Sequence, residues 1–577
     1  MSVSLRRYLL AGAGAGLVAG LIFALAIGVQ GMMGTAAGLL GLTLSGAGLA
    51  GHLLASALLG AGLGLLLRDQ PRNYAAIISS GLLYGLLWWI VGPLTLRPLL
   101  ASGPGPTWSL DHAAAQFPSL IGHLLYGGLA GWGAYLAAGF YTRRHPAPEP
   151  DTAPAPSRRV VILGGGFGGV SAALRLEQIY ARDPSLQITL VSRSNYLLFT
   201  PMLAEVASGS LQAQHISAPV RASCPHTRFV HAEATAIDTE RRTVQVRSQA
   251  SDPGETLAYD HLVLALGSVP SFHGLPGLAD HAFTLKTLHD ATRLRNHVIR
   301  QLERADVETD ETERRCQLTF VVAGGGFAGT EMIAELCDMV HDVRRYFPRI
   351  RASDPRFVLV HSRDRILPEL GPELADYALQ KLQARGIDFL LNTRVSGVEP
   401  DAVLLNDGSR LPSRTLVWTT GNRPNPLLST LPCDRNRRGA VVTGDTLQVR
   451  DLEGVWAVGD CAQVPNLDDG GRPYPPTAQH ALRQGKVAAE NIAAVLAGRP
   501  PKPFRFQIIG LLVALGHRTA AAEIRGRKFS GLLAWFMWRG IYLTKLPGLE
   551  KKLRVLLDWI IDLFFPRDIV LTAREER

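Results

Sequence analysis

The stretch RVVILGGGFGGVSAALRL, residues 159–176, decides the fold of the larger part of this chain. The β-branched and aliphatic run 160–163 predicts a buried parallel strand, and an Ala- and Leu-rich helical pattern follows the glycines directly. Strand, G-x-G-x-x-G and helix in this order are typical of a dinucleotide-binding α/β unit. Gly164 permits the tight turn, Gly166 lets the backbone approach a pyrophosphate, and Gly169 lets the helix pack on the strand. Phe167 and Gly168 complete the loop, whose free N–H groups would hold the phosphates.

A second copy of the motif lies 160 residues further on, in LTFVVAGGGFAGTE at 318–331. Gly324, Gly326 and Gly329 repeat the spacing of the first loop, and Phe327 repeats its phenylalanine. Glycine-rich loops are common, so one copy is weak evidence, but two copies in the same strand–helix setting indicate two adenine dinucleotides.

Two further stretches indicate a prosthetic group in the first unit. YDHLVLALGSVP at 259–270 reads as a buried strand that ends in a small-residue turn at Ala265 and Gly267. GVWAVGDCA at 454–462 is an apolar strand that delivers Asp460 to a buried turn, where its carboxylate can bond a ribityl hydroxyl. Because Gly459 beside it has no side chain, the backbone can approach the cofactor closely there.

The ribose contact of the first unit departs from the common pattern. An acidic residue usually ends the second strand and bonds the adenosine ribose. Here the strand 187–191 is followed by Ser192 and Arg193. Serine can still bond a hydroxyl, so these two residues are the expected ribose contacts.

The N-terminal part predicts a membrane domain. Four apolar runs, 9–29, 49–67, 74–96 and 118–141, are each long enough to cross a bilayer as a helix. A cleaved signal peptide would explain only the first of them.

The chain is basic, with 59 Lys and Arg against 49 Asp and Glu, and the distribution of charge orients the four runs. Arginines flank the first run, the loop between the second and third, and the end of the fourth, at Arg6, Arg7, Arg68, Arg72, Arg143 and Arg144. The other two loops carry only Arg97 and Asp111. The positive-inside rule therefore predicts four spans in the cell (inner) membrane, with both termini and the catalytic body on the cytoplasmic side.

The membrane block reads as a duplicated helical hairpin. GLVAGL at 16–21 resembles GLLYGL at 81–86, and GHLL at 51–54 recurs at 122–125. His52 and His123 then occupy equivalent places inside the membrane. They are candidates for haem or metal ligation or for a quinone contact; the alternative is a structural role in bonds to neighbouring helices, and no metal site is assigned.

The linker and the cysteines carry little chemistry. Residues 143–157, rich in Pro and Ala, read as a semi-rigid spacer. The five cysteines form no C-x-x-C pair and no zinc pattern, which indicates free thiols in a reducing compartment.

The order GGGFGG, ALGSVP, GGGFAGTE, VGDCA resembles the two-dinucleotide-binding flavoproteins. Within them the chain resembles type II, non-proton-pumping NADH:quinone oxidoreductases. The narrower likeness rests on NYLLFTPML at 195–203, LKTL at 285–288 with LRNH at 294–297, and PTAQHALRQG at 476–485. It covers about 158–577; the four-span block lies outside the usual family plan.

The resemblance implies roles for individual residues. The first loop and Asp460 would hold FAD, and the second loop would hold NAD(P)H. Glu331 is similar to the family glutamate near nicotinamide and flavin; the alternative is a glutamate that interacts with the helix dipole. Gln479 and Gln484 match the glutamines that edge the quinone pocket, and Lys545 is a further candidate there. Ala478, in the same segment, is a candidate cofactor contact.

The donor specificity is open on the sequence. The strand 357–360 ends in His361, Ser362 and Arg363, where NADH-specific relatives place an acid. Without that acid a 2′-phosphate is not repelled, and Arg363 supplies a cation. We therefore expect the enzyme to accept NADPH, with or without NADH.

The C-terminal stretch 529–571 mixes Trp, Phe and Leu with basic residues, and charges interrupt each apolar run. Amphipathic helices in the membrane interface fit this pattern; core or dimer helices are the alternative. The resemblance implies both membrane docking and a homodimer contact.

These observations predict a tandem α/β flavoprotein behind an all-α membrane domain. The expected segments are 1–142 membrane domain, 143–157 linker, 158–300 and 413–500 FAD domain, 301–412 NAD(P)H domain, and 501–577 docking segment. The expected reaction passes a hydride from NAD(P)H to FAD and two electrons on to a membrane quinone, without proton pumping and with no nucleic-acid partner. A sulfide:quinone oxidoreductase-like enzyme and a non-catalytic FAD- and NAD(H)-binding redox sensor are the alternatives.

Overall fold

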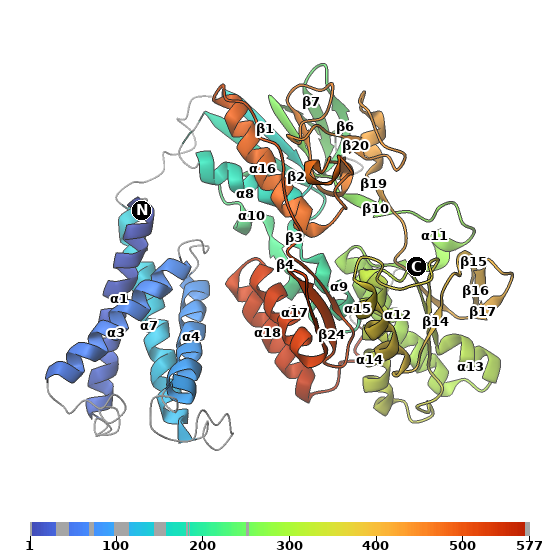
Figure 1. The fold of residues 1–577 in the computed structure, drawn as a ribbon, viewed down its shortest axis with the longest axis horizontal. Coiled ribbons are helices and arrows are strands. Elements are labelled where there is room, and N and C mark those ends of the chain that lie inside the picture. The colour runs from blue at the N-terminus through green and yellow to red at the C-terminus, as the bar shows by residue number, and fades with distance from the viewer. Residues whose placement is uncertain are drawn as a thin grey trace. The chain divides into compact units, whose positions relative to one another are not determined.

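The computed structural model describes residues 3–29, 46–67, 74–96, 115–143, 157–180, 183, 185–249 and 253–571 (Figure 1). The chain divides into two compact units, Met1–Ala153 with Gly548–Glu550, and Pro154–Pro547 with Lys551–Arg577. Arg68, Arg72, Arg97 and Asp111, on which the predicted orientation depends, lie outside the described residues, as do Arg144 and most of the predicted linker.

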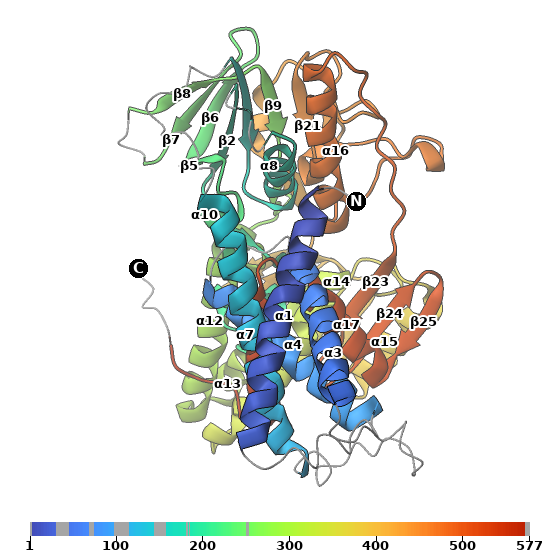
Figure 2. The same cartoon turned by 90° about the vertical axis from the view of Figure 1, so that its left-hand side faces the viewer.

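The N-terminal unit contains four long helices where the four apolar runs predict them. They are α1 (Val3–Val29), α3 (Gly46–Leu66), α4 (Tyr74–Val91, extended by the π-helical turn Gly92–Leu96) and α7 (Phe117–Arg143). The helix α1 packs along α3, and α4 packs along α7 (Figure 2). The contacts are glycine to backbone: a Cβ on Gly16 would lie 2.3 Å from the Ser56 carbonyl oxygen, and one on Gly81 would lie 2.0 Å from that of Gly127. Small residues let helices approach this closely in lipid.

The membrane prediction is met in part. One described helix is long and apolar enough to cross a bilayer, over Leu49–Leu66, and Tyr8–Ala24 and Ser80–Thr95 are shorter apolar stretches. All four predicted runs are helical, but length and composition single out one of them as a span.

The first dinucleotide-binding unit is built on a five-stranded parallel sheet. Its order is β21 (Val455–Ala457), β9 (His261–Leu264), β1 (Arg158–Leu163), β2 (Leu186–Ser192) and β5 (Arg228–His231). The crossover connections return the chain to the same end of the sheet before each strand begins, so the strands pair in parallel. Their aliphatic side chains are buried on both faces of the sheet. The helix α8 (Phe167–Tyr180) follows β1 after the glycine turn. The predicted strand, loop and helix are confirmed here.

The second unit repeats this plan. Its parallel sheet has the order β11 (Ala282–Thr284), β18 (Thr415–Trp418), β12 (Thr319–Ala323), β13 (Arg356–Val360) and β14 (Ile387–Leu390). The helix α14 (Phe327–Val343) follows β12 after the second glycine turn. The central strands of the two sheets, β1 and β12, thus end at equivalent loops.

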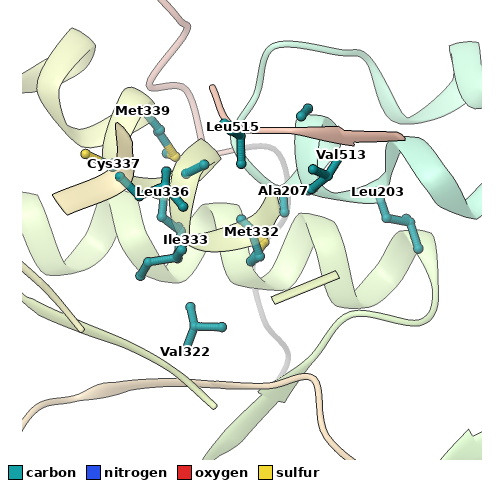
Figure 3. Close-up of a cluster of buried hydrophobic side chains, with 14 of the residues drawn as sticks. Leu203, Ala207, Val322, Met332, Ile333, Leu336, Cys337, Met339, Val513 and Leu515 are labelled. Atoms are coloured by element: carbon teal, nitrogen blue, oxygen red, sulfur yellow. The ribbon is translucent and has the colours of Figure 1, made fainter. Parts of the chain in front are cut away.

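The C-terminal segment contains a sheet that the sequence patterns did not predict. The antiparallel strands β23 (Gly510–Ala514), β24 (Ala520–Ile524) and β25 (Arg527–Ser530) precede the helices α17 (Gly531–Lys545) and α18 (Leu549–Phe564). Val513 and Leu515 pack against Met332 and Leu336 of α14, as Figure 3 shows. This core joins the C-terminal segment to the second unit beside α9 (Leu203–Ala207).

Candidate active site

The two glycine turns have the same strained geometry. Gly164 has φ +112° and Gly324 has φ +117°, values that residues with a Cβ rarely adopt. A Cβ on Gly169 would lie 1.9 Å from the Gly164 oxygen, and one on Gly329 would lie 1.8 Å from the Gly324 oxygen. In contrast, a Cβ on Gly166 or Gly326 would meet nothing within 4 Å. Each loop is therefore closed on the strand side and open on the side where a pyrophosphate would lie, which fits a bound dinucleotide.

One cavity of about 900 Å³ runs from the first glycine turn to the C-terminal segment. Residues predicted to bind FAD line it at one end, and Glu331, Gln479 and Lys545 line it elsewhere. A cavity of this size suits a flavin and part of a second ligand. The predicted residues on its wall are Gly164, Gly166, Phe167, Gly168, Ser192, Arg193, Ala265, Gly267, Phe327, Glu331, Gly459, Asp460, Ala478, Gln479 and Lys545.

Asp460 belongs to a polar cluster that the sequence motifs identified only in part. Ser268 Oγ donates to Asp460 Oδ2 at 2.7 Å, and Lys286 Nζ donates to Ser268 Oγ at 2.8 Å. Lys286 Nζ also lies 3.6 Å from Asp460 Oδ2, and all three residues line the cavity. Ser268 belongs to the stretch 259–270 and Lys286 to the stretch 285–288, but no sequence pattern assigned either of them to the cofactor. The cluster holds the carboxylate in place beside Gly459, where it can accept a bond from a sugar hydroxyl.

At the adenosine end of the first unit, an acidic residue from another strand lies near Ser192 and Arg193. Ser192 ends β2 as predicted, and a Cβ on Gly165 would lie 2.7 Å from its Oγ. Arg193 NH1 lies 3.4 Å from Glu233 Oε1, at the start of β6 (Glu233–Asp238), and Glu233 also lines the cavity. Because Glu233 is distant in sequence and has no motif of its own, no local signal identified it.

In the second unit His361 stands where Ser192 stands in the first. The Gly325 N–H donates to His361 Nδ1 at 3.0 Å, so the middle glycine of the loop is fixed by the ring. Burial lowers the pKa of His361, and the nearby Arg363 lowers it further, which keeps the ring neutral with its proton on Nε2. His361 is 9% exposed, and its Nε2 has no hydrogen-bond partner among the described residues. Arg363 is exposed two residues later.

Glu331 faces the cavity from the second turn of α14, one turn beyond the position where a helix-dipole carboxylate would lie. Its Oε1 accepts a hydrogen bond from the Ala514 N–H of β23 at 3.0 Å. Burial raises the pKa of Glu331 to about 8, and the Ala514 N–H opposes this only in part. The side chain is thus a carboxylic acid at neutral pH, a form that can donate a proton into the cavity.

The two predicted glutamines of α16 (Ala478–Leu496) lie in different surroundings. Gln479 lines the cavity and donates from Nε2 to the Gly510 oxygen at 3.1 Å. Gln484 is buried away from the cavity, and its Oε1 accepts the Gly459 N–H at 2.8 Å. Because helical residues four apart share a face, Arg483 lines the cavity with Gln479, as do Ala478, Ala481, Leu482 and Lys486 of the same helix. Gln484 instead fixes the turn that presents Asp460.

Three aromatic side chains connect the cofactor end of the cavity to its C-terminal end. Phe167 and Phe199 are in edge contact with ring centroids 5.9 Å apart, and Phe199 and Tyr542 are 6.0 Å apart. All three line the cavity, together with Leu511 and Leu512 of β23. A flat, apolar ring is the ligand that such a wall suits.

The cysteines do not line this cavity, and the two histidines of the N-terminal unit bond to helix backbone. Cys224, Cys316, Cys337, Cys433 and Cys461 are free, and none lines the cavity. His52 Nε2 bonds the Gly20 oxygen of α1 at 3.1 Å, and His123 Nδ1 bonds the Ser119 oxygen of its own helix at 2.7 Å. In the described part of the chain no group of three or more His, Cys, Asp or Glu could hold a metal ion.

Fold and site together define a flavoprotein oxidoreductase with two dinucleotide-binding units. Residues 158–485 match the pyridine nucleotide-disulphide oxidoreductase family, and residues 509–568 match the NDH2 C-terminal domain. The second match covers β23 to α18, the segment that contains the additional sheet. The chain belongs to the type II NADH:quinone oxidoreductase family.

Relatives match along nearly their whole length. The chain is 34% identical to a probable NADH dehydrogenase of Dictyostelium discoideum over 72% of this chain and 91% of that protein. It is 33% identical to a demethylphylloquinone reductase of Synechocystis, over 70% and 95%, and 29% identical to a type II NADH:quinone oxidoreductase of Mycobacterium tuberculosis, over 75% and 94%.

Among solved structures, NDH2 of Plasmodium falciparum in complex with NADH has a similar fold. Its TM-score is 0.67 at 19% identity, over 72% of this chain and all of that one. The sulfide:quinone oxidoreductase of Aquifex aeolicus has a TM-score of 0.54 at 19% identity, over 71% and 95%. Both comparisons show the fold alone.

Proposed function

We propose that this protein oxidises NADH, or NADPH, through FAD and reduces a membrane quinone. The observation that carries the proposal is one cavity with a cofactor end and an apolar end. The Gly164 turn and Asp460 lie at the first, and the aromatic wall with Gln479 and Tyr542 lies at the second. The reaction consumes NAD(P)H, one proton and a quinone, and it releases NAD(P)+ and a hydroquinone.

Each part of the chain has a task in this reaction. When bound, FAD supplies the two-electron chemistry that accepts a hydride and passes electrons on. The Asp460 cluster orients the cofactor, and the Gly324 turn with His361 positions the nicotinamide donor. The apolar wall excludes water from the acceptor site, and Glu331 donates a proton there from its neutral form.

The absence of cysteine from the cavity favours this reaction over sulfide oxidation. That chemistry needs thiols that face the flavin, and the described residues place none there. A non-catalytic sensor is the remaining alternative. It would have no need of a neutral carboxylic acid at the apolar end of the cavity.

The donor site supports NADPH as a substrate. His361 has a buried, unpaired Nε2–H at the end of β13, where an acid would bind both ribose hydroxyls and repel a 2′-phosphate. Arg363 supplies a positive charge beside it. We expect kcat/KM for NADPH to lie within a hundredfold of that for NADH; a larger preference for NADH, roughly 3 kcal/mol or more, would contradict this.

The membrane contacts belong to the same proposal. On α1, α3, α4 and α7 large apolar side chains remain exposed, such as Val18 at 61% and Leu58 at 66%. All four helices are proposed to lie in the cell membrane, with the body on its cytoplasmic face and no proton pumping. Leu533 and Phe536 of α17, both 60% exposed, and Phe564 of α18, 77% exposed, are proposed to dock in the interface and to support a homodimer.

The test of the proposed function is a steady-state assay of the full chain in detergent with bound FAD. We expect NADH oxidation that depends on added quinone and yields one hydroquinone per NADH. A protein that binds FAD and NADH but shows no quinone-dependent turnover would be the sensor. Sulfide-dependent quinone reduction without NADH would identify the sulfide oxidoreductase.

A further inference from the structure

The charges on the cavity wall do not balance at its C-terminal end. Arg193 pairs with Glu233, and Lys286 pairs with Asp460, so these cations are offset. Glu331 is neutral at pH 7 because burial raises its pKa to about 8. Arg483 and Lys486 of α16 and Lys545 of α17 also line the cavity, and none of the three forms an ion pair within the described part of the chain.

Arg483 is held rigidly. Its guanidinium carbon lies 3.9 Å above the centre of the Phe506 ring, and its NH1 donates to the Gln479 oxygen at 2.9 Å. The edge of His480 contacts Phe506 with ring centroids 5.3 Å apart, and the Phe506 N–H donates to Tyr474 Oη at 3.3 Å. Stacking on an aromatic face preserves the charge of a guanidinium and leaves its other N–H groups free to donate.

Arg483 is half-buried without a compensating carboxylate, and Lys545 lies exposed on the same cavity wall. Burial lowers the pKa of Arg483, and no carboxylate among the described residues counteracts it. Burial also lowers the pKa of Lys545, and the charge of Arg483 lowers it further, so the two groups repel each other. Like charges on one cavity wall, one of them partly buried, are costly unless an anion binds there.

We propose that Arg483, together with Lys545, selects quinone acceptors that carry an ionised hydroxyl on the ring. The inference rests on the proposed quinone reductase activity and names the acceptor class for the same site. The aromatic wall holds the flat ring, and the guanidinium bonds the oxyanion at its edge. A charge-assisted hydrogen bond of this kind adds directional as well as electrostatic preference.

Gln479 and Arg483 lie on one face of α16 and have different roles in binding the acceptor. Gln479 is engaged with the Gly510 oxygen and fixes β23, whereas Arg483 lines the cavity and keeps donors that its bond to the Gln479 oxygen does not use. Ile508, 42% exposed, lines the cavity next to them and offers an apolar entry from the bilayer side of the proposed docking surface. An acceptor can therefore enter with its apolar face against Ile508 and its anionic edge towards Arg483.

The experiment compares 2-hydroxy-1,4-naphthoquinone, which is ionised at neutral pH, with 1,4-naphthoquinone, which has the same ring and no charge. The full-length protein is assayed in neutral detergent with saturating NADH. We expect Arg483→Gln to lower the ratio of kcat/KM for the anionic acceptor to that for the neutral one by about tenfold, mainly through KM. Arg483→Lys should retain most of the ratio, Lys545→Gln should lower it less, and Arg499→Gln, at an exposed site beyond α16, is the matched control.

An equal effect of Arg483→Gln on both acceptors, or no effect on the ratio, would overturn the proposal. A change that appears only in the presence of anionic lipid would assign Arg483 to a headgroup and would overturn it as well. Failure of the parent protein to reduce 1,4-naphthoquinone would instead refute the quinone reductase activity itself. The two failures are therefore distinguishable.

Discussion

The two dinucleotide-binding units share a sheet, a glycine turn and a helix, and they differ in the residues at the end of the second strand. In the first unit Ser192 lies over the middle glycine of the loop, and Glu233 supplies an acid from β6. In the second unit His361 lies over the middle glycine and bonds its N–H. We therefore propose that turn geometry sets where the phosphates bind, whereas the strand end sets which ribose is accepted. The same fold can hold a resident cofactor in one unit and an exchanging substrate in the other.

The largest effects should come from the glycines that close each turn. Gly169→Ala and Gly329→Ala place a methyl group within 2 Å of a backbone oxygen, at 1.9 and 1.8 Å. Overpacking of this kind costs about 1–3 kcal/mol, or roughly fivefold to a hundredfold in affinity. Gly169→Ala should lower FAD content, and Gly329→Ala should raise KM for NADH while FAD remains bound. Flavin absorbance and donor kinetics measure the two, and the same phenotype in both variants would contradict separate sites.

Glu331→Gln tests the proton donor at the junction of the units. Since the carboxyl is protonated below its pKa of about 8, kcat should fall as pH rises through 8 in the parent protein. Glutamine should lower kcat by about a hundredfold and abolish this dependence. A pH profile of kcat that keeps its alkaline limb in the variant would assign the proton donor elsewhere.

The same group predicts a pH dependence of stability. Between the ordinary glutamate pKa of 4.5 and about 8 the folded chain holds a proton that the unfolded chain has released. The contribution of Glu331 to the free energy of unfolding is therefore complete below pH 4.5 and is lost as pH rises to 8. Thermal unfolding of the parent and of Glu331→Gln between pH 5 and pH 8 measures it; curves that stay parallel would contradict a buried neutral carboxyl.

The strand ends provide the next contrast. His361→Glu should lower the NADPH-to-NADH ratio of kcat/KM by about tenfold to a hundredfold, because the carboxylate binds ribose hydroxyls and repels a 2′-phosphate. Ser192→Glu, the matched change in the first unit, should leave this ratio unaltered. A shift of the donor ratio in the second variant would show that the units are not independent.

The smallest effects should separate the two glutamines of α16. Gln484→Leu leaves the partly buried Gly459 N–H without its acceptor, which costs about 1 kcal/mol and should weaken FAD retention. Gln479→Leu should raise KM for the quinone instead. Titration of released FAD and acceptor kinetics distinguish them, and interchangeable phenotypes would restore the sequence-based pairing of the two side chains.

The parts of this site that sequence could predict are those fixed by local geometry. The turns at Gly164 and Gly324 and the strand that carries Asp460 depend on a few neighbouring residues, so their motifs located them. The role of Gln484 at the quinone pocket stays a prediction: a motif quoted as letters does not say which residue shares a helix face with Gln479, and in the structure Arg483 does. Glu233 reaches the first unit from a separate strand, and the sheet β23–β25 has short strands with a weak pattern. Neither had a local signal.

The most direct test of the account is the pair of half-reactions of the FAD-loaded full chain, followed anaerobically by flavin absorbance. Addition of NADH should bleach the flavin band, and subsequent addition of quinone should restore it with one equivalent of hydroquinone formed. Bleaching without reoxidation by any quinone, or reoxidation that requires another protein, would contradict the claim that the flavin in this cavity passes electrons from NADH to the membrane acceptor.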